Sequence, residues 1–122
     1  MAPGHGYVEV TINKEDYLKP HKNLHRWNWQ FRFAEINGVG VTLNKCWERG
    51  YRGSEEQVNR KTAVHVRIKP FGTAFLDKPF MQFSTNFDKS SPGTMKFIYS
   101  GVDDSAHKLK TKVLEITRSP HK

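Results

Sequence analysis

The residues that could carry chemistry are few, and none stands in a recognisable catalytic arrangement. The single cysteine, Cys46, lies close to Lys45 and Arg49, and neighbouring positive charges lower the pKa of a thiol. No local signature of a thiol enzyme surrounds it, and a lone cysteine is more often a small buried apolar residue. The chain also lacks the Gly-x-Ser-x-Gly motif of serine hydrolases. We expect no nucleophilic site and no internal disulfide.

The histidines and paired carboxylates are weak candidates for metal binding. His21 and His25 are four residues apart, a spacing that would bring both imidazoles to one face of a helix. Pro20 precedes them and strand-like sequence follows, so we expect solvated loop histidines instead. Asp103 and Asp104 offer two carboxylates where calcium takes about six to eight oxygens, and they indicate a turn. The sequence predicts no metal, no cofactor and no catalytic residue, and therefore a protein that is not an enzyme.

One carboxylate continues the phase of an apolar strand. Glu35 falls in step with the aromatic residues that precede it, so it is a candidate for an inward carboxyl group with a raised pKa. The alternative is a carboxylate at the end of the strand, where water reaches it. A glycosidase pair is not expected, because the adjacent acids Glu55 and Glu56 would point to opposite faces of a strand.

An aromatic and basic segment is the best candidate for binding. Residues 46–61 combine glycines, acids and an asparagine, and we interpret them as a long irregular connection of the kind that often carries function. Exposed aromatic side chains flanked by charges suit stacking against a sugar ring. The alternative for its tryptophan is to fold back and cap the core. The predicted ligand-binding residues are Trp47, Arg49, Tyr51, Arg52 and Lys45.

The charge balance points to anionic partners. Lys and Arg number 20 against 12 Asp and Glu, which gives a net charge of +8. Such an excess favours nucleic acid, acidic polysaccharide or a membrane surface, although it also keeps a protein soluble. Basic residues with interleaved aromatics between His21 and Phe33 would suit nucleic acid, but aromatic residues spaced by two cannot serve both a core and a base-stacking surface. No apolar run is long enough for a membrane span, and no signal peptide is visible.

The elements that would position these residues are β-strands. The dominant period is two, and it is clearest where Trp27, Trp29, Phe31 and Phe33 share one face, which we expect to be core. Asn37-Gly38 then provides a turn, so residues 26–45 are predicted to form a β-hairpin. Further strands are expected over residues 7–12, 62–70, on either side of Pro79, 94–99 and 108–117, the last with a bulge near Val113, and a turn over 89–93. The count of seven or eight strands, spaced as in a sandwich, predicts a single all-β domain over residues 1–122.

A resemblance supports this architecture. The segment 92–104 (PGTMKFIYSGVDD), followed by a Lys- and Thr-rich apolar strand, resembles the closing hairpin of immunoglobulin-like and fibronectin type III-like β-sandwich domains of extracellular and cell-surface proteins. The aromatic strand from Trp27 to Phe33 with Asn37-Gly38 resembles the central hairpin of such domains. The paired inter-sheet cysteines of antibody domains are absent. The resemblance implies an antiparallel sandwich and an extracellular or cell-surface location, and no activity.

These observations predict a non-catalytic recognition module. Its partner would be a polysaccharide or a cell-surface protein, bound through the aromatic and basic segment on a preformed scaffold. One alternative is a structural or assembly module that pairs through an edge strand. Another is a small basic nucleic-acid-binding protein.

Overall fold

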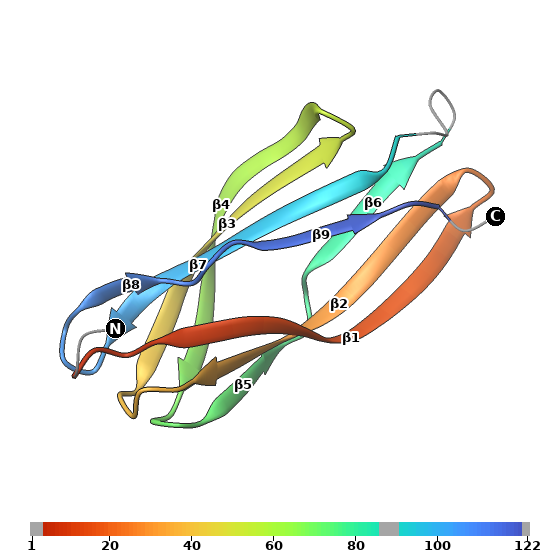
Figure 1. Ribbon diagram of the computed structural model, residues 1–122. Coiled ribbons are helices and arrows are strands. Elements are labelled where there is room, and N and C mark those ends of the chain that lie inside the picture. Colours follow the sequence, from red (N-terminus) through yellow and green to blue (C-terminus); the bar gives the residue numbers. More distant parts are fainter. Residues whose placement is uncertain (1–3, 86–90, 121–122) are drawn as a thin grey trace.

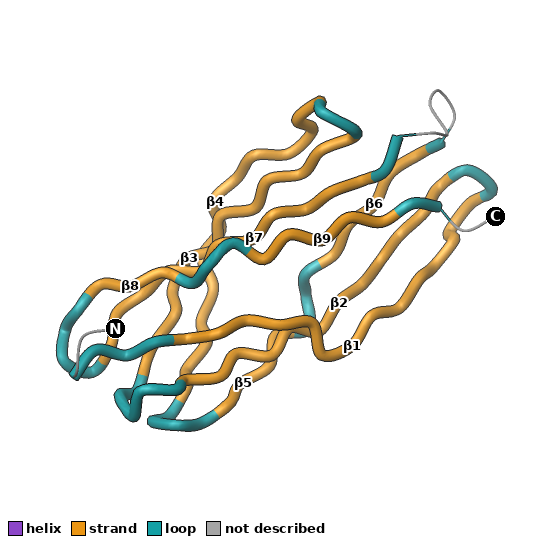
Figure 2. Tube along the Cα trace, viewed as in Figure 1, coloured by secondary structure: helices purple, strands orange, loops and turns teal. Residues whose placement is uncertain are grey.

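Two antiparallel β-sheets stack face to face in the computed structural model, which describes residues 4–85 and 91–120 (Figure 1). The tube in Figure 2 contains strands and loops, and no helix occurs in the described part of the chain. The all-β sandwich predicted from the period of two is therefore confirmed. The strands are β1 (Val8–His21), β2 (Leu24–Glu35), β3 (Val41–Arg52), β4 (Glu55–Ile68), β5 (Thr73–Leu76), β6 (Phe80–Ser84), β7 (Gly93–Asp103), β8 (Lys108–Lys110) and β9 (Leu114–Arg118).

The four-stranded sheet is built around one long central strand, and the five-stranded sheet around two. In the four-stranded sheet, β2 pairs with β1 along one edge and with both β5 and β6 along the other. In the five-stranded sheet, the order is β4-β3-β7, and the free edge of β7 pairs with β8 and then β9. Pro79 separates β5 from β6, as its missing N–H leads one to expect.

The core forms where β2 faces β7. Side chains alternate strictly between buried and less buried along both strands, so each strand sends a row of aromatic rings inward. Trp27 and Trp29 are fully buried, as predicted. The rings of the two sheets meet edge to face, with Phe31 and Phe97 centroids 5.0 Å apart at 78°. This geometry is the favourable one for aromatic quadrupoles, and it fixes the two sheets relative to each other.

The predicted hairpin over residues 26–45 is wrong in its pairing, although both of its strands exist. β2 and β3 belong to different sheets and exchange no ladder hydrogen bonds. Gly38 adopts a positive φ of 86°, as the turn dipeptide suggested, but the turn passes the chain from one sheet to the other. Alternation identifies a strand and its inward face, but it does not say which strand lies beside it.

The predicted irregular connection over residues 46–61 is also wrong. β3 runs on to Arg52, and β4 begins at Glu55 after a two-residue turn in which Gly53 has a positive φ of 57°. Gly50 is buried within β3, and a side chain would not fit there without a shift, because a Cβ would lie 2.8 Å from the Met95 sulfur. The outer faces of both strands are polar and exposed to solvent, so the composition of the strands resembles that of a loop while the backbone remains extended.

The last segment divides into two strands, which brings the described strands to nine. β8 and β9 are separated by residues 111–113, where the phase of the apolar residues changes and a bulge near Val113 was expected. Thr111 is turned inward there, and its hydroxyl accepts a hydrogen bond from the Tyr99 N–H at 3.1 Å. Of the expected turn over 89–93, Lys89 and Ser90 lie outside the described residues.

β1 is longer than its sequence pattern suggests, and it ties the two sheets together laterally. Glu15 on β1 accepts hydrogen bonds from the buried Trp29 indole at 2.6 Å and from Arg118 on β9 at 2.9 Å. Glu15 therefore links a core residue of one sheet to the edge of the other. The expected strand over residues 7–12 continues to His21 because it stays paired with β2 along its length, while most of its later side chains are exposed.

Candidate functional site: the outer face of the five-stranded sheet

The predicted binding residues lie on a strand, and four of the five share one face. Lys45, Trp47, Arg49 and Tyr51 alternate along β3 with the buried Cys46 and Gly50, so they project from the outer face of the five-stranded sheet. A strand places side chains more rigidly than the expected loop would. This face carries the candidate site.

Arg52 is the exception, because it points between the sheets. Its Nη1 donates to the Ser84 carbonyl oxygen at 2.7 Å, and its guanidinium carbon lies 4.2 Å from the centroid of the Phe83 ring. Arg52 thus joins the end of β3 to β6 and is placed apart from the other four.

The strand register arranges the outer face in rows. Lys45 on β3 is aligned with Ser100 on β7, which is aligned with Lys110 on β8. The next row contains Lys61 on β4, Trp47 on β3 and Ile98 on β7. Neighbouring strands are about 4.8 Å apart and successive outward residues about 6.7 Å apart, so these groups surround one shallow area of the sheet.

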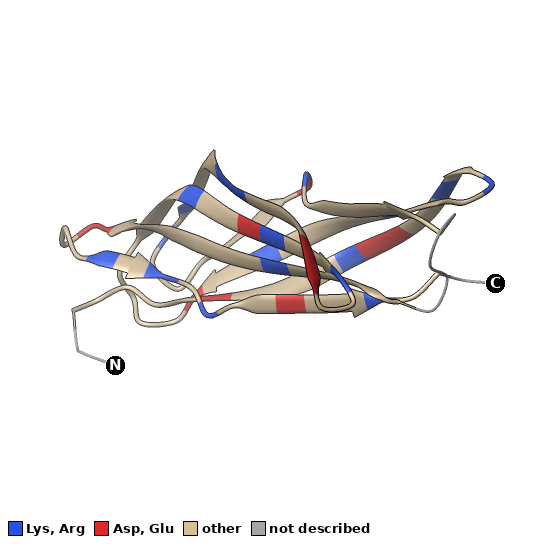
Figure 3. Cartoon of the chain, turned by 90° about the horizontal axis from the view of Figure 1, so that it is seen from above, with Lys and Arg blue, Asp and Glu red and all other residues tan. Residues whose placement is uncertain are grey.

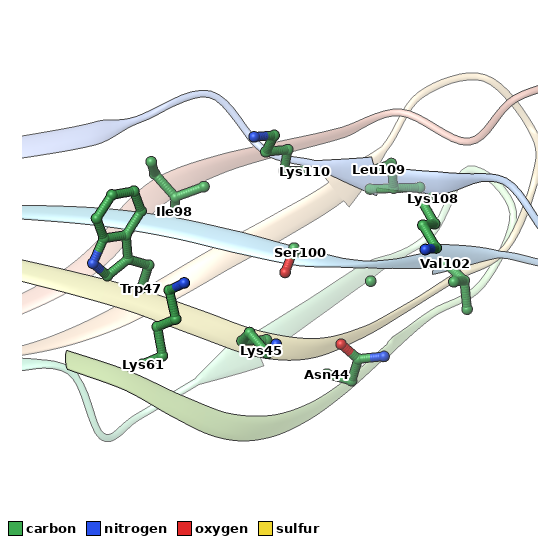
Figure 4. A pocket seen from close by; sticks show the side chains of 11 residues that line it. Asn44, Lys45, Trp47, Lys61, Ile98, Ser100, Val102, Lys108, Leu109 and Lys110 are labelled. Carbon is green, nitrogen blue, oxygen red and sulfur yellow. The ribbon is translucent and has the colours of Figure 1, made fainter.

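A hollow of about 570 Å³ lies over these rows (Figure 4). Trp47 and Ile98 stand at one end in Figure 4, Val102 and Lys108 at the other, and Ser100 lies between them. We call this surface the basic hollow. Its lining residues are Asn44, Lys45, Trp47, Lys61, Ile98, Ser100, Gly101, Val102, Lys108, Leu109 and Lys110.

The electrostatics of the basic hollow are one-sided. Four of its lining side chains are lysines and none is acidic. The four lysines are solvent-exposed and form no ion pair with any acidic side chain that the structure describes. Elsewhere Lys and Arg are distributed over several strands in the view of Figure 3, and several of these side chains are paired with carboxylates. The basic hollow is therefore a local concentration of uncompensated positive charge, which attracts anions.

Trp47 is fixed in place by its neighbours while part of its ring stays exposed. Its indole Nε1 donates to Asn59 Oδ1 at 2.7 Å. The Lys61 ammonium lies 5.5 Å and the Arg49 guanidinium carbon 5.3 Å from the ring centroid. The side chain is half-buried, so it neither caps the core nor protrudes freely. A half-exposed tryptophan held in this way can stack against a flat ligand at a low cost in conformational entropy.

A second hollow of about 420 Å³ adjoins the first and shares Trp47 and Ile98 with it. Its other lining residues are Arg49, Lys96, Val113 and Glu115. Here the charges are paired. Arg49 Nε lies 2.8 Å from Glu56 Oε1, and Lys96 Nζ lies 3.5 Å from Glu115 Oε1. We call this surface the paired hollow.

Sequence reasoning missed the partners that β4, β7 and β8 contribute. Lys61, Ile98 and Lys110 lie far from Trp47 in the chain, and only the strand register brings them beside it. Lys108 and Lys110 do belong to a visibly basic C-terminal stretch, which was the one available signal.

Cys46 is placed for packing and is unsuited to thiol chemistry. Its side chain is buried in the core, where burial raises the thiol pKa to about 12. The expectation that Lys45 and Arg49 would lower this pKa is wrong, because both side chains project from the opposite face of β3. A thiol that stays protonated is a poor nucleophile and metal ligand.

The histidine pair does not come together as a metal site. His25 is buried on β2 instead of solvated, and its Nδ1 lies 2.5 Å from the Tyr17 hydroxyl and its Nε2 3.3 Å from the Thr85 hydroxyl. His21 is exposed at the end of β1. Within residues 4–85 and 91–120, no three His, Cys, Asp or Glu side chains form a group that could hold a metal ion.

Glu35 is buried, so the interpretation in which water reaches this carboxylate at the strand end is wrong. It is an inward carboxylate, but its pKa is lowered, so the alternative expectation of a raised pKa is also wrong. Burial acts to raise the pKa, and hydrogen bonds from backbone N–H groups outweigh it. Both carboxyl oxygens serve as acceptors for the loops at this end of the sandwich. The five donors are the N–H groups of Tyr7, Asn37, Gly38, Val39 and Phe71.

Asp103 plays a similar role at the same end of the molecule. Burial acts to raise its pKa, but the backbone N–H groups of Gly6, His107 and Ser105 and the His107 imidazole lower it to about 2. Both carboxylates are acceptors for loop backbone, as the turn expected at Asp103 suggests. Neither faces a hollow on the outer sheet face.

Comparison with known proteins shows the fold and nothing of the activity. No family model and no curated protein matches the chain. The structural genomics target SoR45 is similar over 98% of this chain and 89% of its own, with a TM-score of 0.74 and 12% identity. A Bordetella pertussis protein, provisionally named ApaA, is similar over 94% of both chains, with a TM-score of 0.72 and 13% identity. A protein from Archaeoglobus fulgidus is similar over 92% of this chain and 99% of its own, with a TM-score of 0.57 and 7% identity.

These likenesses establish the all-β fold. At such identities they carry no residue roles to this chain. The described residues contain no helix long and apolar enough to cross a membrane.

Proposed function

We propose that the protein is a non-catalytic binding module that recognises an acidic polysaccharide on the outer face of its five-stranded sheet. The observation that carries the proposal is the basic hollow, in which the half-exposed Trp47 stands among four lysines and no acid. The ring supplies a stacking surface for a sugar, and the ammonium groups supply contacts for its anionic substituents. The rigid strands β3, β7 and β8 supply a preformed site.

The composition of the hollow favours a polysaccharide over single-stranded nucleic acid. Proteins that bind single strands stack successive bases on several aromatic side chains along a basic groove. The basic hollow offers one aromatic ring, Trp47, beside the aliphatic Ile98. The only other aromatic residue among the predicted binding residues, Tyr51, lies two rows away, where Lys96 is 5.2 Å from its ring centroid.

The proposal retains the immunoglobulin-like resemblance and the extracellular or cell-surface location that it implies. A polysaccharide ligand agrees with that location, because acidic glycans are abundant outside cells. A cell-surface protein with an acidic patch would use the same lysines, and it is the alternative partner of this site.

The test is a binding titration with heparin, at several salt concentrations, of a double variant and a matched control. Lys45→Gln with Lys110→Gln removes two ammonium groups from the basic hollow, and Lys14→Gln with Lys19→Gln removes two exposed ones from β1 on the other sheet. An exposed charge contact is worth up to about 1 kcal/mol, so we expect the first pair to bind about tenfold more weakly. The slope of log affinity against log salt concentration should also be smaller for this pair, by the amount that two lost charge contacts contribute.

The control pair should bind like the wild type. An equal loss in both pairs would mean that only net charge matters, and it would refute the site. Failure of wild-type protein to bind any acidic polysaccharide would refute the function.

A second candidate function is assembly through an edge strand, and the length and unpaired edge of β4 favour it. β4 is 14 residues long, contains no proline and pairs only with β3 among the described strands. Long unpaired edges are templates for another strand. Sedimentation velocity at micromolar concentration tests this candidate: assembly predicts an oligomer, which a proline in place of Thr62 should convert to monomer, and a monomeric wild type would exclude it.

A further inference from the structure

The two hollows on the outer face adjoin each other, and we call the two together the track. Trp47 and Ile98 line both of them, so the hollows meet across this pair of side chains. Along β3, the basic hollow includes Lys45 and the paired hollow includes Arg49, four residues further on. Four residues of a strand span about 13 Å, which is the length of a short oligosaccharide and exceeds that of one sugar.

The two ends of this track differ sharply in charge. The basic hollow presents four lysines without an acidic partner that the structure describes. In the paired hollow, each cationic side chain already forms an ion pair with a carboxylate, Arg49 with Glu56 and Lys96 with Glu115. An anion placed there would meet Glu115 and would have to displace it from Lys96, whereas an anion in the basic hollow meets lysines and no acidic side chain.

A paired hollow suits hydroxyl and amide groups. Each sugar hydroxyl both donates and accepts hydrogen bonds, and neighbouring carboxylate and ammonium groups offer both partners at once. Glu115 and Lys96 are exposed enough to rearrange around such a group, with side-chain exposures of 57% and 39%. The exposed Val113 beside them adds apolar surface for the face of an uncharged sugar.

We propose that the ligand is an acidic polysaccharide in which anionic sugars are separated by uncharged ones. The anionic unit lies in the basic hollow, the uncharged unit lies in the paired hollow, and the sugar between them stacks on Trp47. This inference rests on the proposed function, because it assigns the ligand class of the same site. It differs from simple attraction between opposite charges, which would favour the most densely charged chain.

The test compares two probes with the same backbone and length. One is an oligogalacturonate, which carries a carboxylate on every sugar, and the other is the same oligomer with half of its carboxylates converted to methyl esters. Calorimetric titration at physiological salt should show about fivefold tighter binding of the half-esterified oligomer. The reason is that placing a carboxylate, instead of an uncharged ester, in the paired hollow weakens the binding free energy by about 1 kcal/mol. Bulk electrostatics predicts the opposite order.

A charge-reversal variant in the paired hollow gives a more specific test of the same preference. Glu115→Lys removes the carboxylate that disfavours an anion, so the preference should shift to the fully charged oligomer. Glu9→Lys makes the same charge change at an exposed site on β1 and should leave the preference of the wild type intact. Thermal unfolding of both variants confirms that they fold.

The outcomes separate the inference from the function on which it rests. Equal or tighter binding of the fully charged oligomer by the wild type would overturn the inference and leave the function standing. A preference that survives Glu115→Lys would also overturn it. If neither oligomer nor heparin binds, or if only single-stranded DNA binds, the proposed function fails and the inference with it.

Discussion

Replacing Glu35 by glutamine should cost the protein a large part of its stability. The carboxylate is 2% exposed and accepts five backbone hydrogen bonds from three separate loop segments. Oε2 accepts from Tyr7 at 3.0 Å and Asn37 at 2.8 Å, and Oε1 accepts the other three. A glutamine amide has one acceptor oxygen and one NH2 group, so its nitrogen must face at least two N–H donors.

The expected magnitude follows from those lost acceptors. A buried donor left without a partner costs about 1 to 3 kcal/mol, and a bond to a charged acceptor is stronger than one to a neutral acceptor. Two orphaned N–H groups at Oε2 therefore cost about 4 kcal/mol. The total free energy of unfolding of a domain is typically about 5–15 kcal/mol. The Glu35→Gln variant should therefore remain folded at neutral pH, but with a much smaller free energy of unfolding than the wild type.

The assay is equilibrium urea unfolding followed by the fluorescence of the buried Trp27 and Trp29. With a slope of about 2 kcal/mol per molar urea, a loss of about 4 kcal/mol moves the midpoint down by about 2 M. Glu9→Gln, at an exposed position on β1, is the matched control and should leave the midpoint unchanged. A midpoint shift that corresponds to less than 1 kcal/mol for Glu35→Gln would refute the acceptor role.

Three further predictions concern the binding face, the response to acid and the cysteine. Trp47→Ala should weaken heparin binding about tenfold in calorimetry while the thermal midpoint stays within a few degrees, because the ring lies on the outer face; unchanged affinity would exclude stacking. The folded-state pKa values of Glu35 and Asp103 are lowered, the latter to about 2, so their stabilisation is present above about pH 4 and is lost as the pH falls through the folded pKa values. The urea midpoint should therefore drop between pH 4 and 2, and less so in Asp103→Asn; an equal drop in that variant would contradict this assignment. Cys46 should resist a thiol reagent at pH 8 in the folded protein and react in urea, since burial raises its pKa to about 12; rapid labelling of the folded protein would show that the thiol is accessible.

Much of the scaffold could be predicted from the sequence, because a strand with one buried face has apolar residues at every second position. Trp27 to Phe33 and Met95 to Tyr99 each place large apolar residues at every second position, and both proved to be inward rows of central strands. Alternation is a property of one strand and its two faces. It therefore identified β2 and β7 but did not show that β2 and β3 lie in different sheets.

The candidate site was harder to predict, because its residues come from strands distant in the sequence. Trp47, Arg49 and Tyr51 could be singled out by their chemistry, yet their polar surroundings resembled a loop. The hairpin of β3 and β4 showed instead that this polarity belongs to a wet sheet face. The basic hollow depends on β8 pairing with β7, and that register depends on the turn at 104–107 and the inward Thr111. No local pattern around Trp47 contains this information.

Acrylamide quenching of tryptophan fluorescence during titration with heparin, at low and high salt, tests directly whether the ligand lies on Trp47. Of the three tryptophans, Trp27 and Trp29 are at most 1% exposed, so a neutral quencher reports on Trp47 in the candidate site. We expect saturating heparin to protect Trp47 from acrylamide, high salt to abolish the protection, and a neutral glucan to give none. Unchanged quenching at heparin concentrations that calorimetry shows to be saturating would place the ligand elsewhere and refute the basic hollow as the binding site.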